Sequence, residues 1–326
     1  MIDSIELENL YKNELQDNLK SLESLRKKVK RGQIFGFAFI ILAFILFVPV
    51  TAALEQYNSE ALPFLVVAPV AIIGAIILFR THKKKKLYRQ KFKQEVVSEI
   101  VKAIDPTWEY NADQHISSSE YRSSDLFKQS VDRYRGDDLI SGKIEKTDFR
   151  CSELHTEYKT VTTDKNGARK ETWHTIFKGL FFHADFNKEI KGKTYIEPDT
   201  AERLLGKFGQ GLQMSSKGKL VKLENPEFEK IFAVFGTDQT EARYILTPTI
   251  MEALVNIYKK YKRKMHLSFI GSRVYVAMSF NKNLFEPKVF SSGVNYKDIE
   301  FMYNLFEINQ IIIHELNLNT RIWTKE

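Results

Sequence analysis

The sequence predicts an α+β protein in which a two-helix transmembrane hairpin precedes a cytoplasmic domain of mainly antiparallel sheet and packed helices. Three observations lead to this prediction. Two long apolar blocks lie before residue 80, strand-like segments after residue 105 are separated by turn signals, and helix-like segments fall between runs of these strands. Strands in runs, rather than strict strand–helix alternation, are typical of α+β folds.

Each apolar block has the length and composition of a membrane-spanning helix. Between Ile34 and Val50 there are 17 residues without a charge, 13 of them Leu, Ile, Phe or Val, and the segment 33–54 would extend roughly 33 Å as a helix. In the second block, 61–79, the same four types supply 12 residues. A buried hairpin of a soluble core seldom lacks polar residues for so long, and a signal peptide begins closer to the N-terminus. Both blocks are therefore predicted to span a membrane.

Basic residues flank both outer ends of this pair. The connection 51–60 contains Glu55 and Glu60 but no Lys or Arg. Because positive flanks stay in the cytoplasm, we expect a multi-pass protein with both termini cytoplasmic. The segment 83–86 could serve only as this topology anchor, or it could recruit an anionic lipid. The basic residues expected at the membrane interface are Arg26, Lys27, Lys28, Lys30, Arg31, Arg80, Lys83, Lys84, Lys85 and Lys86.

The net charge of +8 does not indicate a nucleic-acid-binding protein. Thirteen basic residues lie in the segments 26–31 and 80–93, and they leave 36 basic against 41 acidic residues elsewhere. A nucleic-acid interface needs a distributed basic surface, so no nucleic-acid partner is expected. The single cysteine, Cys151, excludes an intrachain disulfide and a thiolate-built metal site, and its strand position predicts a small core residue.

Four regions follow from these patterns. Leucines at steps of three and four from Leu15 to Leu25, and apolar residues at four-residue steps from Phe92 to Ile104, indicate helices on the outer side of each span. These two helices could pair as a stalk, or each could lie on the domain or the membrane surface. The regions are 1–32, an amphipathic N-terminal helix; 33–79, the transmembrane helices 33–54 and 61–79 with a short extracytoplasmic loop; 80–104, a basic juxtamembrane helix; and 105–326, a cytoplasmic α+β domain of one or two subdomains.

Turn and cap signals divide the domain into elements. Asn166-Gly167 separates the strand-like arms 139–161 and 172–186, and Gly271-Ser272 separates 266–270 from 273–280, so two hairpins are predicted. The second arm should point Trp173, Phe177 and Phe181 inward. Lys191-Gly192 should turn the chain into a strand at 194–197; further strands are expected at 219–224 and 230–235, and helices near 120–134, from Asp199, from Asp238 to Ile245, from Pro248 to Tyr261, and at 297–316.

No motif assigns a catalytic, cofactor-binding or metal-binding residue. The glycines between 206 and 211 lack the ending of a phosphate loop. The seven histidines show no ligand pair at helical spacing, and His174 and His183 have opposite strand parity. Asp137 and Asp138 are adjacent, and neighbours in an extended strand point apart, so they are expected to be a poor acid–base pair. Catalytic residues are left unassigned, and no cofactor or metal is expected.

The densest charge after the spans lies at the end of a predicted helix. Cations there are favoured by the helix dipole, or they could form a patch that docks on an anionic membrane surface. The residues of this patch are Lys259, Lys260, Lys262, Arg263 and Lys264.

Several segments resemble a known family. These are "LENPEFEKIFAVFGTDQTEARYILTPTIMEAL" from Leu223, "SFIGSRVYVAM" ending at Met278, "IFKGLFFHADFNK" at 176–188 and "LNLNTRIW" at 316–323. With the two preceding spans, they resemble a bacterial family of membrane proteins catalogued as domain of unknown function 3137. The resemblance implies a bacterial cytoplasmic (inner) membrane, and it implies no established activity, cofactor or catalytic residue.

Two functions remain open. Clear anchoring without a catalytic motif favours a non-enzymatic interaction or regulatory module at the inner membrane. The alternative is an enzyme acting on a lipid or membrane-associated substrate through a site assembled only in three dimensions. The expected partners are the lipid bilayer and another membrane or membrane-associated protein, while the sequence leaves the oligomeric state open.

Overall fold

The fold was analysed in a computed structural model that describes residues 4–57, 61–164, 167–198, 214–215, 217–291 and 294–315. The chain divides into two compact units. The first contains residues 1–103 and 285–302, and the second contains 104–284 and 303–326. Long apolar helices followed by an eight-stranded antiparallel sheet with helices confirm the predicted α+β class.

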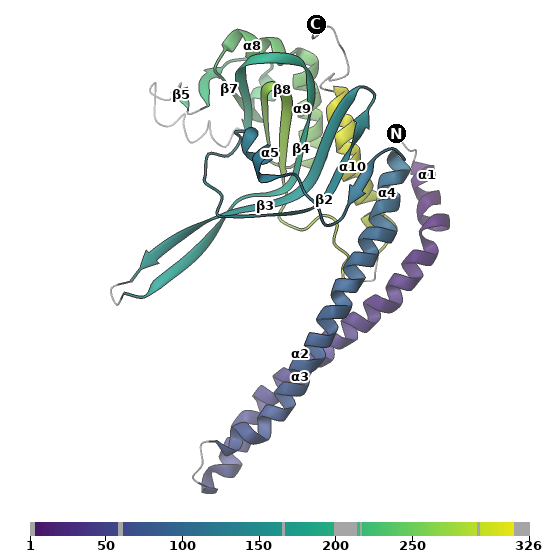
Figure 1. Ribbon diagram of the computed structural model, residues 1–326, viewed down its shortest axis with the longest axis vertical. Coiled ribbons are helices and arrows are strands. Elements are labelled where there is room, and N and C mark those ends of the chain that lie inside the picture. The colour runs from purple at the N-terminus through teal and green to yellow at the C-terminus, as the bar shows by residue number, and fades with distance from the viewer. Residues whose placement is uncertain are drawn as a thin grey trace. The chain divides into compact units, whose positions relative to one another are not determined.

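The first unit is built on two long helices that run side by side (Figure 1). The chain enters through α1 (Ser4–Asn9) and the π-helical turn η1 (Leu10–Glu14). Helix α2 (Gln16–Leu54) ends in the 3₁₀ turn η2 (Glu55–Tyr57), and the return path is α3 (Leu62–Phe92), the π-helical turn η3 (Lys93–Val97) and α4 (Ser98–Ile104). The polar start of α2 contacts η3, where Asn18 Nδ2 donates to the backbone oxygen of Glu95 at 3.1 Å.

Residue spacing explains how the part of α2 between Leu22 and Ala43 packs on α3. Buried residues recur on α2 at seven-residue steps, and the facing residues of α3 do the same. A strict seven-residue repeat keeps one seam between two helices and imposes a left-handed supercoil. The seam consists of Leu22, Val29, Gly36 and Ala43 on α2 and Val67, Gly74, Thr81 and Tyr88 on α3.

The second unit contains the sheet, in the order β1-β2-β3-β4-β7-β6-β5, with β8 paired to β4. All strand pairs are antiparallel. The strands are β1 (Glu109–Asn111), β2 (Arg133–Ile144), β3 (Thr147–Thr163), β4 (Arg169–Pro198), β5 (Met214–Ser215), β6 (Gly218–Val221), β7 (Phe232–Gly236) and β8 (Met265–Ser279).

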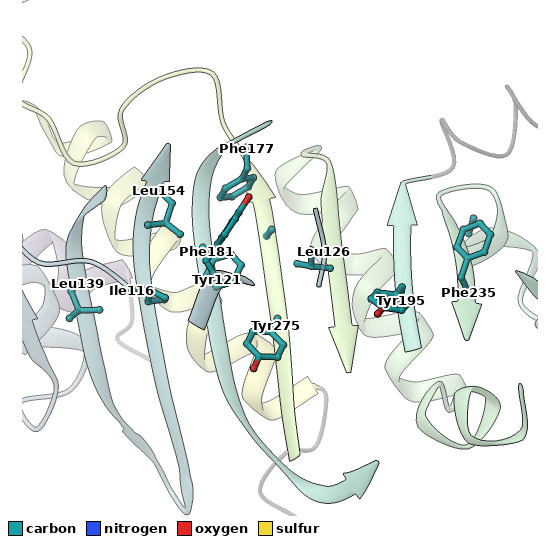
Figure 2. Close-up of a cluster of buried hydrophobic side chains, with 12 residues drawn as sticks. Ile116, Tyr121, Leu126, Leu139, Leu154, Phe177, Phe181, Tyr195, Phe235 and Tyr275 are labelled. Carbon is teal, nitrogen blue, oxygen red and sulfur yellow. The ribbon is translucent and has the colours of Figure 1, made fainter. Parts of the chain in front are cut away.

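Both predicted hairpins are present. Strands β3 and β4 pair from Phe149↔Ala184 out to Thr163↔Arg169. Strand β8 doubles back at Gly271, where glycine readily adopts the required φ of 59°. The reversal brings the two ends of β8 together, and the amide of Ser279 donates to the backbone oxygen of Lys264 at 2.9 Å. The two halves of β4 pair with the two arms of β8, so β4 arches over that hairpin, and its second half contains the strand expected at 194–197 (Figures 1 and 2).

Helices cover both faces of this sheet (Figure 1). On one face, α5 (Ser118–Ser123) packs over an aromatic core that includes Tyr121, Phe181 and Tyr275 (Figure 2). The other helices in the described part of the chain after α5 are α7 (Pro226–Glu229), α8 (Gln239–Ile245), α9 (Pro248–Tyr261) and α10 (Tyr296–Glu315). The predicted caps of α8 and α9 are confirmed: the side chains of Asp238 and Thr247 accept backbone N–H groups of the first turn.

Three expectations were wrong in detail. The helix predicted near 120–134 is the six-residue α5, which ends because Asp125 adopts a left-handed conformation with φ 51°. The predicted arm 139–161 is two strands, since Glu145, with φ 53°, reverses the chain between β2 and β3. Of the aromatic residues expected to point inward, Phe177 and Phe181 are buried and Trp173 is only half-buried. The helix expected from Asp199, the glycines at 206–211, Asn166 and the segment 316–323 lie outside the described residues.

Candidate functional site

The most distinctive surface of the molecule is the apolar exterior of α2 and α3. In the most apolar window of each helix only 6% and 17% of the residues are buried, and side chains such as Phe44 and Val48 are 82% and 72% exposed. A soluble protein rarely exposes a continuous apolar surface of this kind. Both helices are long and apolar enough to be candidate membrane spans.

Two glycines set how closely the helices approach. A Cβ atom added to Gly74 would lie 2.9 Å from the backbone oxygen of Gly36, and one added to Gly36 would lie 2.5 Å from Leu78 Cδ2. Small residues at such a crossing let backbones approach, which is how helices associate where lipid removes the hydrophobic drive. Both glycines belong to the seven-residue repeat of the seam, and Leu22 of that repeat also belongs to the leucine pattern between Leu15 and Leu25.

The structure brings the two predicted basic flanks to the same level of the hairpin. A Cβ added to Gly32 would lie 2.1 Å from Thr81 Oγ1, so residues 28–31 lie beside the start of the segment 83–86. Lys83, Lys84, Lys85 and Lys86 are all exposed. Among the described residues, Lys28, Lys30, Arg31, Arg80 and Lys83–Lys86 have no carboxylate partner, whereas Lys27 lies 3.7 Å from Glu23.

Arg26 differs from the other predicted interface residues because it is buried within the first unit, with 6% of its surface exposed. Its guanidinium pairs with Glu23 at 2.6 Å and donates from Nη1 to the backbone oxygens of Val289 and Ser291 at 2.8 and 2.5 Å. The hydrogen bond with Arg26 lowers the pKa of Glu23. Arg26 therefore holds a backbone segment rather than facing headgroups.

A second pair of cations holds the same segment. Arg89 Nε lies 2.6 Å from Glu286 Oε1, and the Nζ atom of Lys93, which is 2% exposed, lies 3.4 Å from the same oxygen. We call Arg26, Arg89, Lys93 and the segment 285–291 the clasp. Arg26 and Lys93 are buried, and buried charges are stable only when paired. With Arg89, they tie this segment to α2 and to the return path formed by α3 and η3.

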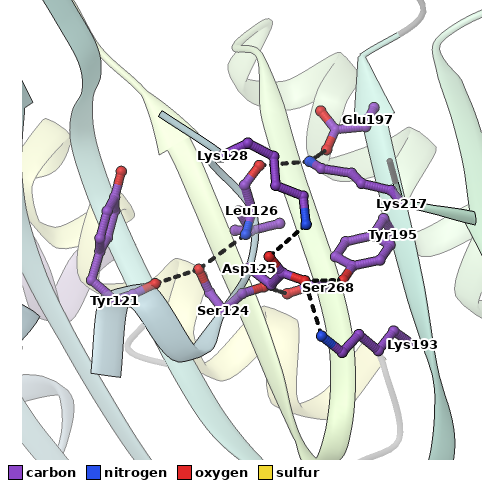
Figure 3. A network of polar contacts seen from close by, with 10 residues as sticks. All are labelled: Tyr121, Ser124, Asp125, Leu126, Lys128, Lys193, Tyr195, Glu197, Lys217 and Ser268. Atoms are coloured by element: carbon purple, nitrogen blue, oxygen red, sulfur yellow. Dashed lines mark hydrogen bonds and ion pairs between the residues drawn. The ribbon is translucent and has the colours of Figure 1, made fainter. Parts of the chain in front are cut away.

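The densest polar network of the second unit surrounds Asp125 (Figure 3). Its carboxylate accepts hydrogen bonds from Lys128 (2.7 Å), Lys193 (3.0 Å) and Tyr195 (2.5 Å). Burial favours the neutral acid, but these three hydrogen bonds outweigh burial and lower the pKa of Asp125 to about 2. A carboxylate with three donors is a poor base, and the network fastens the chain after α5 to the sheet.

The same network continues to Glu197. Lys217 donates to Glu197 and to the backbone oxygen of Leu126, and His266 Nδ1 lies 2.5 Å from Glu197 Oε2. Burial would raise the pKa of Glu197, but His266 and Lys217 lower it. Both carboxylate oxygens of Glu197 therefore have a partner, Oε1 in Lys217 and Oε2 in His266.

His183 is the most deeply buried histidine of the described chain, with 2% of its surface exposed. Its Nδ1 accepts from Arg273 at 2.9 Å and its Nε2 lies 3.3 Å from Glu120 Oε1. Burial, and then the charge of Arg273, lower the pKa of His183 to about 4, so the ring is neutral at pH 7. Because an arginine can only donate, the ring's lone pair at Nδ1 is already in use.

Asp137 and Asp138 were expected to point apart, but the structure brings their carboxylates together. Together with Glu153 on β3, their carboxylate oxygens lie within 4.8 Å of one another. A bulge between Asp137 and Ile140, with Asp138 at φ 57°, breaks the alternation of the strand. Tyr110 donates to Asp138 at 2.5 Å, and the amide of Leu284 donates to Glu153 at 2.8 Å. By donor chemistry, these three oxygen ligands are the described residues best suited to hold a divalent cation.

The predicted patch at the end of α9 is partly engaged within its own unit. Lys259 pairs with Glu227 at 2.6 Å, Lys260 lies 3.3 Å from Glu307, and Arg263 stacks over the ring of Phe280 at 5.2 Å. Lys262 ends the helix in a left-handed conformation. Three of the five cations have these contacts, Lys262 and Lys264 are exposed, and docking of the patch on an anionic membrane stays a prediction.

The fold and its exposed surface define a class: an α+β protein with a pair of candidate membrane helices. Residues 175–318 match the family model described as Protein of unknown function (DUF3137), which confirms the resemblance to this domain of unknown function for the segments inside that range. The chain is also similar to a solved structure titled crystal structure of the mycobacterial trehalose monomycolate transport factor A, TtfA, with 10% identity and a TM-score of 0.33 over 68% of this chain and 92% of that chain. No curated protein matches the chain.

Proposed function

We propose that the protein is a membrane-anchored interaction or regulatory module of a bacterial inner membrane. Helices α2 and α3 cross the bilayer as a hairpin, and the sheet domain works on the cytoplasmic side. The uncovered apolar exterior of α2 and α3 carries this proposal, because transfer of such side chains to hydrocarbon is favourable by about 0.3–0.6 kcal/mol each.

Extraction of membranes tests the anchor. The full-length protein should stay in the pellet after an alkaline carbonate wash and leave it only with detergent, since an inserted hairpin is not held by charge. Quantitative release by carbonate alone would contradict insertion and would indicate a surface-bound protein.

The interaction role is supported by a projecting part of the sheet (Figure 1). Strand β2 pairs with β3 only as far as Glu157, and β8 pairs with β4 only from Gly179. Beyond these points the segments 158–163 and 169–174 pair only with each other among the described strands, and we call them the ribbon. A two-stranded ribbon is marginally stable by itself, and its two edges are covered by no other described strand, which suits them to contact with another protein.

Catalysis is less well supported by the ionisable clusters. Asp125, Glu197 and the Nδ1 atom of His183 each have partners inside the domain, so their lone pairs serve internal contacts. An enzyme acting on a lipid or membrane-associated substrate therefore stays the alternative.

A photo-crosslinking amino acid at Val161, which is 51% exposed on the ribbon, tests the interaction role in intact cells. The matched control is the same amino acid at Tyr244, which is 47% exposed on α8. We expect a discrete adduct from Val161 that Tyr244 does not give. Equal patterns at the two positions would contradict a ribbon-specific contact.

A further inference from the structure

We propose that eight cations at the base of the helix hairpin form a collar that binds the phosphate-bearing headgroups of anionic lipids in the folded protein. The proposal rests on the membrane anchor proposed above and extends it, since a topology signal needs only a count of charges during insertion. The collar consists of Lys28, Lys30, Arg31, Arg80, Lys83, Lys84, Lys85 and Lys86.

The fold brings the two parts of the collar together. The two parts of the collar are some fifty residues apart in the sequence, yet the contact of Gly32 with Thr81 places them at one level of the antiparallel pair. At about 1.5 Å of rise per residue, the collar occupies only about 10 Å along the helices. Eight like charges so close together would repel one another unless an anionic partner offset them.

The side chains of the collar are available to an external anion. The described residues provide none of these eight side chains with a carboxylate within 4 Å, whereas the neighbouring Arg26, Lys27 and Arg89 are all paired. The basic residues of the clasp are used internally, and those of the collar are left exposed to their surroundings, apart from the half-buried Lys30.

The collar also lies where lipid headgroups would be. The collar lies directly beside the uncovered apolar surface: Ile34 follows Arg31 by three residues, and Phe79 precedes Arg80. The Nζ atom of Lys83 lies 5.3 Å from the centroid of the Phe79 ring, at the boundary between apolar and basic surface. Lipid headgroups lie at such a boundary, and a soluble phosphate has no reason to prefer it.

Native mass spectrometry of the full-length protein in a neutral detergent tests the collar. The probes are phosphatidylglycerol, phosphatidylcholine and inorganic phosphate, titrated separately. The collar variant carries K83Q, K84Q, K85Q and K86Q, and the other basic flanks remain to preserve orientation. The control variant carries K259Q, K260Q, K262Q and K264Q, which removes the same charge from the end of α9.

Each cation near an anionic surface contributes up to about a fivefold gain in binding. We therefore expect the collar variant to bind phosphatidylglycerol at least about tenfold more weakly, the control variant to bind like the wild type, and phosphatidylcholine to bind weakly to all three. Equal phosphatidylglycerol binding by the wild type and the collar variant would overturn the proposal. So would loss confined to the control variant, equal binding of the two lipids, or displacement of the lipid by inorganic phosphate at equal concentration.

Carbonate extraction of the collar variant separates this proposal from the anchor. A variant that stays in the membrane but loses phosphatidylglycerol selectivity supports both. A wild-type protein released by carbonate contradicts the anchor, whatever its lipid preference.

Discussion

Asp125 shows how much a single residue determines locally. Its left-handed backbone ends α5, and its carboxylate then accepts hydrogen bonds from Lys128, three residues further along the chain, and from Lys193 and Tyr195 on β4 (Figure 3). Turn residues that accept several hydrogen bonds convert a loop into a fixed part of the fold. The sequence around Asp125 contains no signal for these partners, because two of them lie about seventy residues away.

The pH dependence of stability should report this carboxylate. The pKa of Asp125 is about 2 in the folded protein and near 3.8 when unfolded, so its contribution is present above the unfolded value and is lost as the pH falls towards 2. Asp125→Asn tolerates the same backbone and should lower the free energy of unfolding near pH 7, with the difference shrinking below about pH 4.

Chemical denaturation of the detergent-solubilised protein between pH 2 and 7 measures this effect. Asp148→Asn is the matched control, because the Asp148 side chain is 73% exposed and lies 3.5 Å from Lys143. A pH-independent difference for Asp125→Asn, or the same profile for both variants, would contradict the role given to the network.

Cys151 should be chemically silent in the folded protein. It is fully buried, and burial raises the pKa of its thiol well above the usual range, so little thiolate forms and reagents cannot reach it. A thiol-reactive dye should therefore leave the native protein unlabelled and label it stoichiometrically in denaturant. Rapid labelling of the native protein would show that this side of the sheet opens.

Among elements, the seam between α2 and α3 depends on Gly36 and Gly74. Gly36→Leu would force its side chain into Leu78 and the facing backbone, and overpacking of this kind costs about 1–3 kcal/mol. We expect a lower thermal midpoint in detergent than for Ala38→Leu, the same type of change at an exposed position two residues away. Equal midpoints would show that the seam does not require the close approach.

The clasp makes a separate prediction. Arg26→Met would leave the backbone oxygens of Val289 and Ser291 without their donor and Glu23 without its partner, a loss of about 3–5 kcal/mol for a buried pair. Hydrogen exchange in the segment 285–291 should accelerate strongly. Arg31→Met, on the same helix but exposed, should leave that exchange unchanged.

Elements with local signals were predictable, and those decided by backbone irregularities were not. The caps at Asp238 and Thr247 and the turn at Gly271 act within a few residues, so the local sequence is enough to indicate them. The convergence of Asp137 and Asp138 with Glu153 depends on a bulge and a positive φ at a non-glycine residue, which strand alternation does not foresee. The clasp joins residues more than 190 apart, beyond the reach of periodicity.

At the scale of the whole molecule, the chain joins an uncovered apolar hairpin to a sheet domain with a well-filled core. Hydropathy predicted the first from composition, because a bilayer selects length and apolarity directly. The ribbon was not predictable, because it depends on where the neighbouring strands stop pairing. The burial of Arg26 was not predictable either, because its partners Val289 and Ser291 lie far away in the sequence. The proposed role of the domain depends on this hairpin crossing a bilayer twice.

Cysteine accessibility tests this double crossing most directly. In a Cys151→Ser background, Tyr57→Cys places a thiol at the tip of the hairpin, where the side chain is 61% exposed, and Asp148→Cys places one on the domain. A membrane-impermeant maleimide added to intact cells should label Tyr57→Cys, and it should label Asp148→Cys only after permeabilisation. Labelling of both positions from the same side of the membrane would contradict a double crossing with the domain in the cytoplasm.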